Sequence, residues 1–235
     1  MKTIPAALHI PELADEPGLV HGFSTVLLGS VGLKHAPDPG PVLSARRSFM
    51  EVLGLESAEL TTIGAVHGAA AARVDEPGGS VDDVDALITD RPGVALFATY
   101  ADCYPIVLWD PAKKVAGLVH AGWRGTSEGV AGAAVRFMQD EFGCRNIVAG
   151  IGPGICGHCY EVGPEVAGKF DARFVWPGKS DRLLLDLASA NGAQLEEAGV
   201  NAIYEIGMCT KESYLFPSHR RYPDGSRFGA IVALR

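Results

Sequence analysis

The sequence lacks the features that direct a protein to nucleic acids or membranes. Its 235 residues contain no run of lysines or arginines, and the formal net charge is -8 at pH 7. A broad basic face for phosphate backbones is therefore not expected. No apolar run approaches the roughly 20 residues that span a bilayer. Prolines and acidic residues interrupt the N-terminal segment 1–18, where a secretory signal would be continuously apolar. We expect a cytoplasmic protein that binds neither nucleic acid nor membrane.

The sequence also lacks the cysteine pattern of a disulfide-stabilised protein. Five cysteines, an odd number, are scattered through a long chain: Cys103, Cys144, Cys156, Cys159 and Cys209. This pattern favours free thiols or metal ligands over a disulfide framework. With 47% hydrophobic and 20% charged residues, the composition is that of a globular protein that can bury a substantial core.

The order of apolar runs and helical patterns predicts one α/β domain over residues 1–235, in which helices flank a mixed β-sheet. No internal repeat or linker divides it. Strands are predicted over residues 17–28, with an interruption at His21-Gly22, and over 61–66, 86–89, 94–99, 115–119, 146–151, 183–187, 202–206 and from 228 onward. Helices are predicted over residues 44–53, 126–143 and 188–198, and from Pro164. Loops are predicted over residues 29–41 and 75–85.

The stretch over residues 94–125 organises the chain, because its apolar runs end in reactive residues. One run leads to Cys103 and another to His120, and a third β-prone run ends on His67. If the strands are neighbours at one edge of a sheet, these side chains reach one metal ion. Zinc accepts thiolate sulfur and imidazole nitrogen, which makes the three residues candidate metal ligands. The alternative for Cys103 is a small apolar residue of the core.

Several polar residues are candidates for substrate contacts. Arg124 lies where a strand turns into a predicted helix start, and free N–H groups there favour an anion such as phosphate. Arg46 on a predicted helix and Arg221 in the polar loop 218–221 are further anion ligands, unless they are ordinary surface arginines. Asp102 either orients a ligand or caps a strand end.

Cys156 and Cys159 have the C-x-x-C spacing of a redox or metal-binding pair. They lie in a glycine- and proline-rich loop, and the sequence predicts no helix that begins at the first cysteine, as thioredoxin-like chemistry would need. We therefore favour a loop that lines a pocket, with Cys159 and Tyr160 in contact with substrate.

These motifs together resemble the laccase-domain family. The resemblance runs from about His21 to the C-terminus and is carried, in order, by ADCYPI, HAGWRG, GPGICGHCYEVG, LDLASANGAQLEEAGV and SHRR. That family has been labelled polyphenol oxidase or multicopper oxidoreductase laccase, and is better described as a zinc-dependent purine nucleoside phosphorylase.

The resemblance implies a compact α/β fold peculiar to this family. It also implies zinc bound by His67, Cys103 and His120, which match the VHG, ADC and HAGWRG motifs. The implied reaction is phosphorolysis of adenosine, inosine, guanosine and methylthioadenosine, with adenosine deamination as a second activity. Its partners are a nucleoside and phosphate, in a monomer or homodimer. Some bacterial members resemble editors of peptidoglycan precursors.

The chain departs from the family pattern in the N-terminal loop and at three residues. Val26 replaces an arginine, Ala65 a glutamine and His158 a cysteine, and the loop after Val26 is short. These changes leave the metal triad intact and alter the surroundings of the substrate.

Three alternatives to a zinc phosphorylase are considered for the same residues. In an amide hydrolase, Cys103 is the nucleophile, His120 the base, and Asp102 or another carboxylate the orienting group. A copper-dependent oxidase is disfavoured, because the chain has seven histidines and no His-x-His pair. A His/Cys site can still bind copper through its affinity. A metal carrier without catalytic activity is the remaining interpretation.

Overall fold

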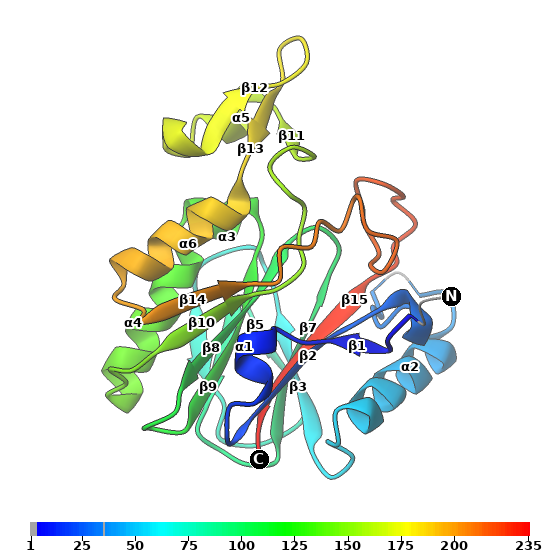
Figure 1. The fold of residues 1–235 in the computed structure, drawn as a ribbon. Helices are drawn as coiled ribbons and strands as arrows, with labels where there is room; N and C mark the ends of the chain where they lie inside the picture. The colour runs from blue at the N-terminus through cyan, green and yellow to red at the C-terminus, as the bar shows by residue number, and fades with distance from the viewer. Residues whose placement is uncertain (1–3, 35) are drawn as a thin grey trace.

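Two mixed β-sheets lie face to face in the computed structural model, which describes residues 4–34 and 36–235. Helix α2 (Pro39–Val52) covers one outer side, and the helices near the second sheet cover the other (Figure 1). A small third sheet projects from one end. The predicted α/β class with mixed sheets is confirmed. The sequence pattern did not reveal that the strands divide between two large sheets.

The first sheet has the strand order β1-β2-β15-β7-β3-β5. Its strands are β1 (Ala7–Leu8), β2 (Leu19–Ser24), β15 (Phe228–Leu234), β7 (Val94–Tyr100), β3 (Glu59–Gly64) and β5 (Ser80–Asp82). The strand pairs β1–β2, β2–β15 and β15–β7 are antiparallel, and the pairs β7–β3 and β3–β5 are parallel. The apolar strands β7 and β15 therefore occupy the centre, where both faces of a strand are covered.

The second sheet has the strand order β14-β10-β8-β9-β6-β4. Its strands are β14 (Ala202–Glu205), β10 (Val148–Ile151), β8 (Tyr104–Asp110), β9 (Val115–Ala121), β6 (Ala86–Thr89) and β4 (Ala71–Arg73). The four central strands pair antiparallel, and each edge strand adds in parallel.

The remaining elements are helices and the third sheet. The helices are α1 (Pro11–Ala14), η1 (Val26–Leu28), α2, α3 (Trp123–Ser127), α4 (Val130–Phe142), α5 (Pro164–Ala167), η2 (Ala172–Phe174) and α6 (Leu187–Glu197). The third sheet pairs β11 (Glu161–Val162), β13 (Leu183–Leu185) and β12 (Val175–Pro177) in that order, antiparallel. No helix within the described residues has the length and apolar character needed to cross a membrane.

The hydrophobic core consists of three layers, because each large sheet is covered on both faces. Leu96 of β7 packs between the sheets with Leu118 of β9. Its neighbour Phe97 points the other way and packs with Phe49 of α2. On the far side of the second sheet, Val119 packs in a cluster that includes residues of α4 and α6. Successive side chains of a strand point to opposite faces, so an unbroken apolar run fills two core layers.

Strands β7 and β9 belong to different sheets, which corrects the prediction that they share one sheet edge. β7 pairs with β15 and β3, whereas β9 pairs with β8 and β6. The short turn 101–103 carries the chain from β7 in one sheet to β8 in the other. The Tyr100 hydroxyl donates to the Val119 carbonyl across the gap, at 3.0 Å. The ends of the facing strands therefore meet without being hydrogen-bonded neighbours.

Two helix predictions need correction. Helix α2 begins at Pro39, not at residue 44, because the Asp38 side chain caps it by accepting the Gly40 N–H at 2.9 Å. The helix predicted over residues 126–143 is instead α3 and α4, which are separated at Gly129. Gly129 has φ = +85°, a left-handed conformation that ends one helix before the next begins.

Two strand predictions also differ from the structure. β2 runs through His21-Gly22 without a break, since the buried His21 ring accepts the Ile10 N–H through Nε2 at 2.9 Å. Burial lowers the pKa of His21 to about 4 and keeps the ring neutral. Within the predicted loop 75–85, Ser80–Asp82 forms β5. The helix start at Pro164 and the final strand from Phe228 are confirmed.

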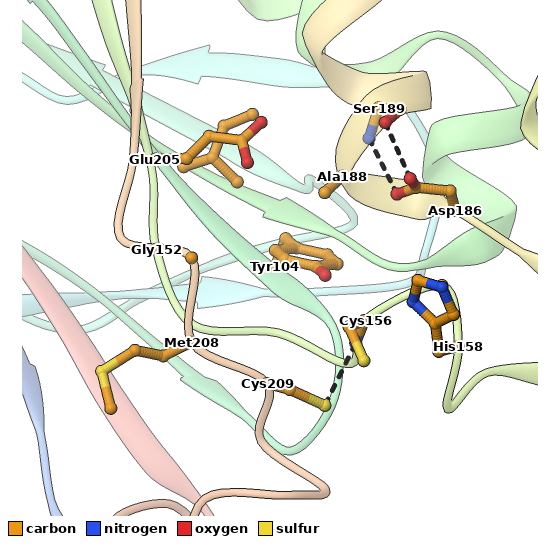
Figure 2. Close-up of a pocket in the computed structure, with 13 residues that line it drawn as sticks. Tyr104, Gly152, Cys156, His158, Asp186, Ala188, Ser189, Glu205, Met208 and Cys209 are labelled. Carbon is orange, nitrogen blue, oxygen red and sulfur yellow. Dashed lines mark hydrogen bonds between the residues drawn. The ribbon is translucent and has the colours of Figure 1, made fainter.

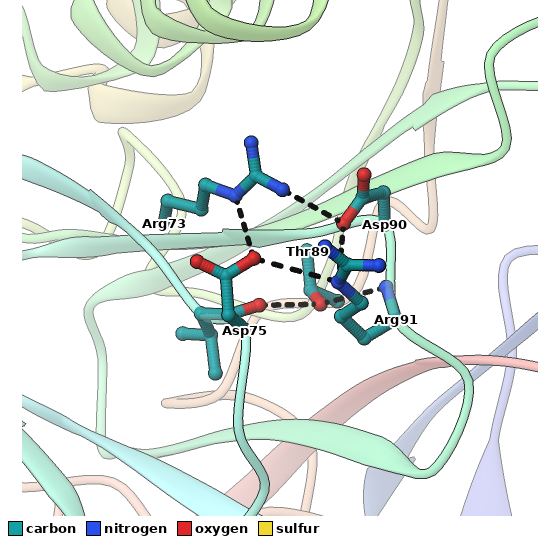
Figure 3. Close-up of polar contacts among 6 residues, drawn as sticks. Arg73, Asp75, Thr89, Asp90 and Arg91 are labelled. Carbon is teal, nitrogen blue, oxygen red and sulfur yellow. Dashed lines mark hydrogen bonds and ion pairs between the residues drawn. The ribbon is translucent and has the colours of Figure 1, made fainter.

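An exposed network of ion pairs lies at the ends of β4 and β6, at the edge of the second sheet (Figure 3). Arg73 pairs with Asp75 at 2.8 Å and with Asp90 at 3.4 Å, and Arg91 contacts the same two carboxylates. Beneath them the Thr89 hydroxyl donates to the Val74 carbonyl at 2.8 Å. Solvent screens the exposed ion pairs, so we expect the buried Thr89 hydrogen bond to contribute more to the stability of the contact between β4 and β6.

Replacing Leu118 by alanine tests the core between the sheets. Leu118 is 0% exposed, so Leu118→Ala is expected to lower the free energy of unfolding by about 2–5 kcal/mol through lost contacts and a cavity. Leu43 on α2 is 47% exposed, and Leu43→Ala serves as the matched control with an expected change within about 0.5 kcal/mol. Urea unfolding measures both, and equal losses would contradict the layer assignment.

Candidate metal centre

His67, Cys103 and His120 come together at one end of the facing sheets. His67 follows β3 of the first sheet, Cys103 lies in the turn between β7 and β8, and His120 is in β9 of the second sheet. One donor atom from each lies within 4.8 Å of the other two. The two imidazole rings are edge-to-face, with centroids 4.9 Å apart. The structure therefore brings together the three residues that the sequence singled out.

The approach of these side chains depends on Gly122. A Cβ atom at this position would lie 2.9 Å from Cys103 Sγ and 3.2 Å from His67 Cδ2. Because glycine has no Cβ atom, it leaves the space that the thiol and the imidazole occupy. This steric requirement explains why the HAGWRG motif has glycine at position 122.

Asp85 is the principal residue of the site that sequence reasoning missed. Its buried carboxylate lies 2.9 Å from His120 Nδ1 and accepts backbone N–H groups of Val66, His67 and Gly68 at 3.2, 3.1 and 2.7 Å. When Nδ1 carries the proton toward Asp85, Nε2 is free to bind a metal. The sequence feature that could have revealed Asp85 is its position directly before the apolar run of β6. Asp85 also ends the acidic stretch 75–85, which indicated only a turn.

Two residues at the site have left-handed backbone conformations. His67 has φ = +64° and Asp102 has φ = +86°, values that non-glycine residues seldom adopt. The Asp85 contacts hold the turn at His67. Such conformations persist where the surrounding hydrogen bonds fix them, and they concentrate at functional sites.

Asp102 positions a loop and does not contact Cys103. Its carboxylate accepts the Thr210 hydroxyl and the Arg220 backbone N–H, both at 2.7 Å. These contacts tie the turn after β7 to the segment 210–220, so they differ from both predicted interpretations, ligand orientation and strand-end capping. The carboxylate that contacts and orients the His120 ring is that of Asp85, not that of Asp102.

The site favours a thiolate beside an imidazolium when no metal is bound. Burial opposes ionisation of Cys103, but His120 and His67 outweigh it and lower the pKa of the thiol to about 6. Burial likewise opposes the charged form of His120, while Cys103 and Asp85 raise the pKa of the ring to about 9. Stabilising the Cys103 thiolate also favours metal binding, because the thiolate is the form of cysteine that binds metals.

The donor set fits zinc. Two imidazole nitrogens and one thiolate are ligands that zinc prefers, and three protein ligands are typical of a catalytic site that keeps one position for water or substrate. All three residues also line a cavity of about 670 Å³, from which water or substrate would reach a bound ion.

The cavity is lined by cations and hydroxyls. The basic residues are Lys34, Arg46, His219 and Arg227, and the hydroxyl residues are Thr62, Ser80 and Thr99. Among the described residues that line it, none carries a carboxylate. In a protein of net charge -8, this local excess of positive charge favours an anionic ligand.

Arg46 is the predicted anion ligand that reaches the cavity. Its Nε donates to the Val31 carbonyl at 2.9 Å, and its guanidinium lies 4.6 Å from the centre of the Phe97 ring. These contacts fix the direction of the side chain, which lines the cavity.

Arg221 and Arg124 occupy other positions, which corrects two expectations. Arg221 donates from its Nη atoms to four carbonyls at 2.6–2.9 Å, those of Thr210, Lys211, Ser213 and Phe216. It therefore braces its own loop in place of clamping an anion. Arg124 is exposed and lies over the Trp123 ring at 4.4 Å. Neither arginine is among the described residues that line the cavity.

Tyr160 and Cys159 also lie away from the large cavity. Tyr160 borders a separate hollow of about 380 Å³ together with Trp123 and Arg220, whose guanidinium lies 4.9 Å from the Tyr160 ring. Burial raises the pKa of Tyr160 to about 12. Cys159 Sγ lies 3.5 Å from the Glu212 carboxylate, outside both hollows. The C-x-x-C loop is therefore not a wall of the metal cavity.

Asp85→Asn is expected to weaken zinc binding about 10- to 100-fold, the usual effect of losing the hydrogen-bond partner of a ligating histidine. An amide cannot hold the Nδ1 proton as a carboxylate does, so Nε2 becomes a poorer ligand. Competition with a chromophoric chelator measures the affinity. Asp83→Asn, an exposed position two residues earlier, is the matched control and should bind zinc normally. Equal affinity in the two variants would contradict the role of Asp85.

Alkylation of Cys103 in metal-free protein should show an inflection near pH 6, because that is the pKa of this thiol. Above this pH the thiolate predominates and the rate reaches its plateau; below it the thiol is protonated and reacts slowly. Peptide mapping after iodoacetamide treatment measures the rate at this residue. His120→Ala should move the inflection upward, and zinc should protect the thiolate. An unshifted inflection near pH 8.5 would contradict the ion pair.

The comparisons with known proteins agree with the motifs. Residues 21–235 match the family model described as multi-copper polyphenol oxidoreductase laccase. A purine nucleoside phosphorylase of Deinococcus radiodurans is 38% identical over 202 residues, which cover 84% of this chain and 79% of that protein. The adenosine deaminase RL5 of an unknown prokaryotic organism is 35% identical over 205 residues, which cover 77% and 76%.

A solved structure has the same fold. The crystal structure of YlmD from Geobacillus stearothermophilus aligns with a TM-score of 0.90 and 32% identity, over 100% of this chain and 98% of that chain. The family model covers all three metal-ligand candidates, and the relatives match most of the chain. The chain therefore belongs to the multi-copper polyphenol oxidoreductase laccase family, as its motifs predicted.

Proposed function

We propose that the protein is a zinc-dependent purine nucleoside phosphorylase that acts on adenosine, inosine, guanosine or methylthioadenosine. The observation that carries the proposal is the cationic cavity, free of carboxylates among its described residues, that opens onto His67, Cys103 and His120. Relatives named purine nucleoside phosphorylase support the choice of reaction.

Phosphorolysis requires that phosphate attack the anomeric carbon of ribose while the purine leaves. The transition state resembles an oxocarbenium ion, so the protein must hold the anion in line and neutralise charge as the base departs. The guanidinium groups of Arg46 and Arg227 suit this task, because a planar fork of N–H donors matches phosphate oxygens. We assign phosphate to these two residues, with Lys34 and His219 beside them, and not to Arg124.

The other cavity residues suit the nucleoside. Thr62, Ser80 and Thr99 supply hydroxyls that can pair with ribose, while Leu33 and Ile63 offer apolar surface for the purine. The cavity thus combines apolar surface with directed polar groups, and small-molecule sites use both.

His67, Cys103 and His120 would hold the zinc, and Asp85 would keep His120 in the ligating tautomer. When bound there, zinc supplies Lewis acidity toward the purine or an adjoining polar group. The relative named adenosine deaminase supports deamination as a second reaction of the same site. Copper is a less favoured occupant. Sites with imidazole and thiolate ligands bind copper tightly in general, so copper binding alone would not identify it as the native metal.

An amide hydrolase that edits peptidoglycan precursors is the second candidate. The observation in its favour is the Cys103 thiol, whose pKa of about 6 makes it a nucleophile beside the His120 ring. In that reaction Asp85, which contacts His120 Nδ1 at 2.9 Å, takes the orienting role first assigned to Asp102.

The proposal predicts release of free purine that requires both phosphate and Cys103. Zinc-loaded protein is incubated with the four nucleosides, with and without phosphate, and chromatography measures the free base. Cys103→Ala is expected to abolish turnover, whereas Cys144→Ala, a cysteine outside the site, should retain it. Release without phosphate, or full turnover by Cys103→Ala, would contradict the proposal. Cleavage of an aminoacylated peptidoglycan precursor alone would support the hydrolase.

The assignment of phosphate to Arg46 has its own test. Arg46→Ala should raise the KM for phosphate about 10- to 100-fold, since a hydrogen bond to a charged group contributes about 1.5–3 kcal/mol. Arg47→Ala is the matched control, because Arg47 is the exposed neighbour on the same helix. An unchanged phosphate KM in Arg46→Ala would place the anion elsewhere.

A further inference from the structure

A second group of potential metal ligands lies outside the nucleoside cavity. Cys156, Cys159, Cys209 and Glu212 place one donor atom each within 4.8 Å of the other three. Cys156 and Cys159 lie in the loop that follows β10, and Cys209 and Glu212 lie in the segment that follows β14. Each segment contributes two ligands separated by two residues, the C-x-x-C and C-x-x-E spacings. Paired ligands from two turns are the usual arrangement of a structural zinc site.

Backbone hydrogen bonds hold the two segments together. Gly154 N–H donates to the Met208 carbonyl at 3.3 Å, and Thr210 N–H donates to the Gly154 carbonyl at 2.9 Å. Cys156 N–H donates to the sulfur of Cys209 at 3.3 Å, a contact that Figure 2 shows between the facing loops. The ligands are thus positioned by a frame that does not depend on an ion.

The carboxylate of Glu212 completes the group. Its oxygens lie 3.5 Å from Cys159 Sγ and 4.0 Å from Cys156 Sγ. A divalent cation at the centre of this group would contact all three sulfurs and the carboxylate, and its charge would offset that of the ionised ligands. Three sulfurs and one oxygen around one point are also more than a single disulfide can use.

We propose that Cys156, Cys159, Cys209 and Glu212 form a second, structural zinc site. Thiolate ligands favour zinc over magnesium or calcium, and four protein ligands leave no position for substrate. The function we assign is to fix the segment from Cys209 onward, which continues to Thr210, the partner of Asp102, and to His219 and Arg227 in the cavity wall. The site does not depend on the nucleoside reaction.

Metal analysis of protein purified from zinc-containing medium tests the proposal. We expect two zinc ions per chain in the wild type and one in Cys209→Ser, while Cys144→Ala retains two. Glu212→Gln provides a milder test, because Glu212 is exposed and its loss should not unfold the chain; the second zinc should leave with a chelator that the wild type resists. Glu196→Gln, another exposed carboxylate, is the matched control.

Cobalt binding identifies the ligands directly. In the His67→Ala/His120→Ala variant only the second site remains, and cobalt should produce a near-ultraviolet band of thiolate-to-metal charge transfer, which Cys159→Ser weakens. Glu212→Cys should strengthen the band, because it adds a fourth sulfur. A folded variant with no such band, a wild type with a single zinc, or a Cys156 disulfide found by thiol titration and mass spectrometry would overturn the proposal.

Discussion

The carboxylate of Asp85 joins the two large sheets at the metal centre. It accepts the backbone N–H groups of Val66, His67 and Gly68, which follow β3 of one sheet, and it contacts His120 Nδ1 in β9 of the other. The backbone carbonyl of Asp85 also accepts the His120 N–H at 2.7 Å. One buried anion therefore holds the backbone at one candidate histidine ligand, His67, and contacts the ring of the other, His120. Because its charge is paired on both sides, burial of this carboxylate does not leave an unsatisfied group.

The facing sheets explain how an acidic protein makes a cationic cavity. Lys34 and Arg46 come from the N-terminal third of the chain, and His219 and Arg227 from its C-terminal segment. Two buried carboxylates near the metal-ligand candidates make other contacts: Asp102 holds the C-terminal segment, and Asp85 contacts His120 and the backbone at His67. Because no carboxylate is among the described residues that line the wall, Lys34, Arg46 and Arg227 give the cavity a positive local charge, which favours phosphate.

The C-terminal segment links the two proposed metal sites. Cys209 and Glu212 belong to the second cluster, Arg221 braces the carbonyls of residues 210–216, and Arg227 lines the cavity. A loop of this length has little secondary structure of its own, so its position depends on side-chain contacts at several points. Zinc at the second cluster would add one such point at the beginning of the segment.

The sequence by itself determined the fold class and the family, and it singled out the three candidate metal ligands, because apolar runs mark buried strands and His67, Cys103 and His120 each lie in a recognisable motif. Only the tertiary structure decided that β7 and β9 lie in facing sheets, that Asp85 orients His120, and that Arg221 braces a loop. It also decided that Cys209 and Glu212 join the C-x-x-C pair. Periodicity reports whether a strand is buried but not which strand it faces, and these contacts join residues up to 56 positions apart.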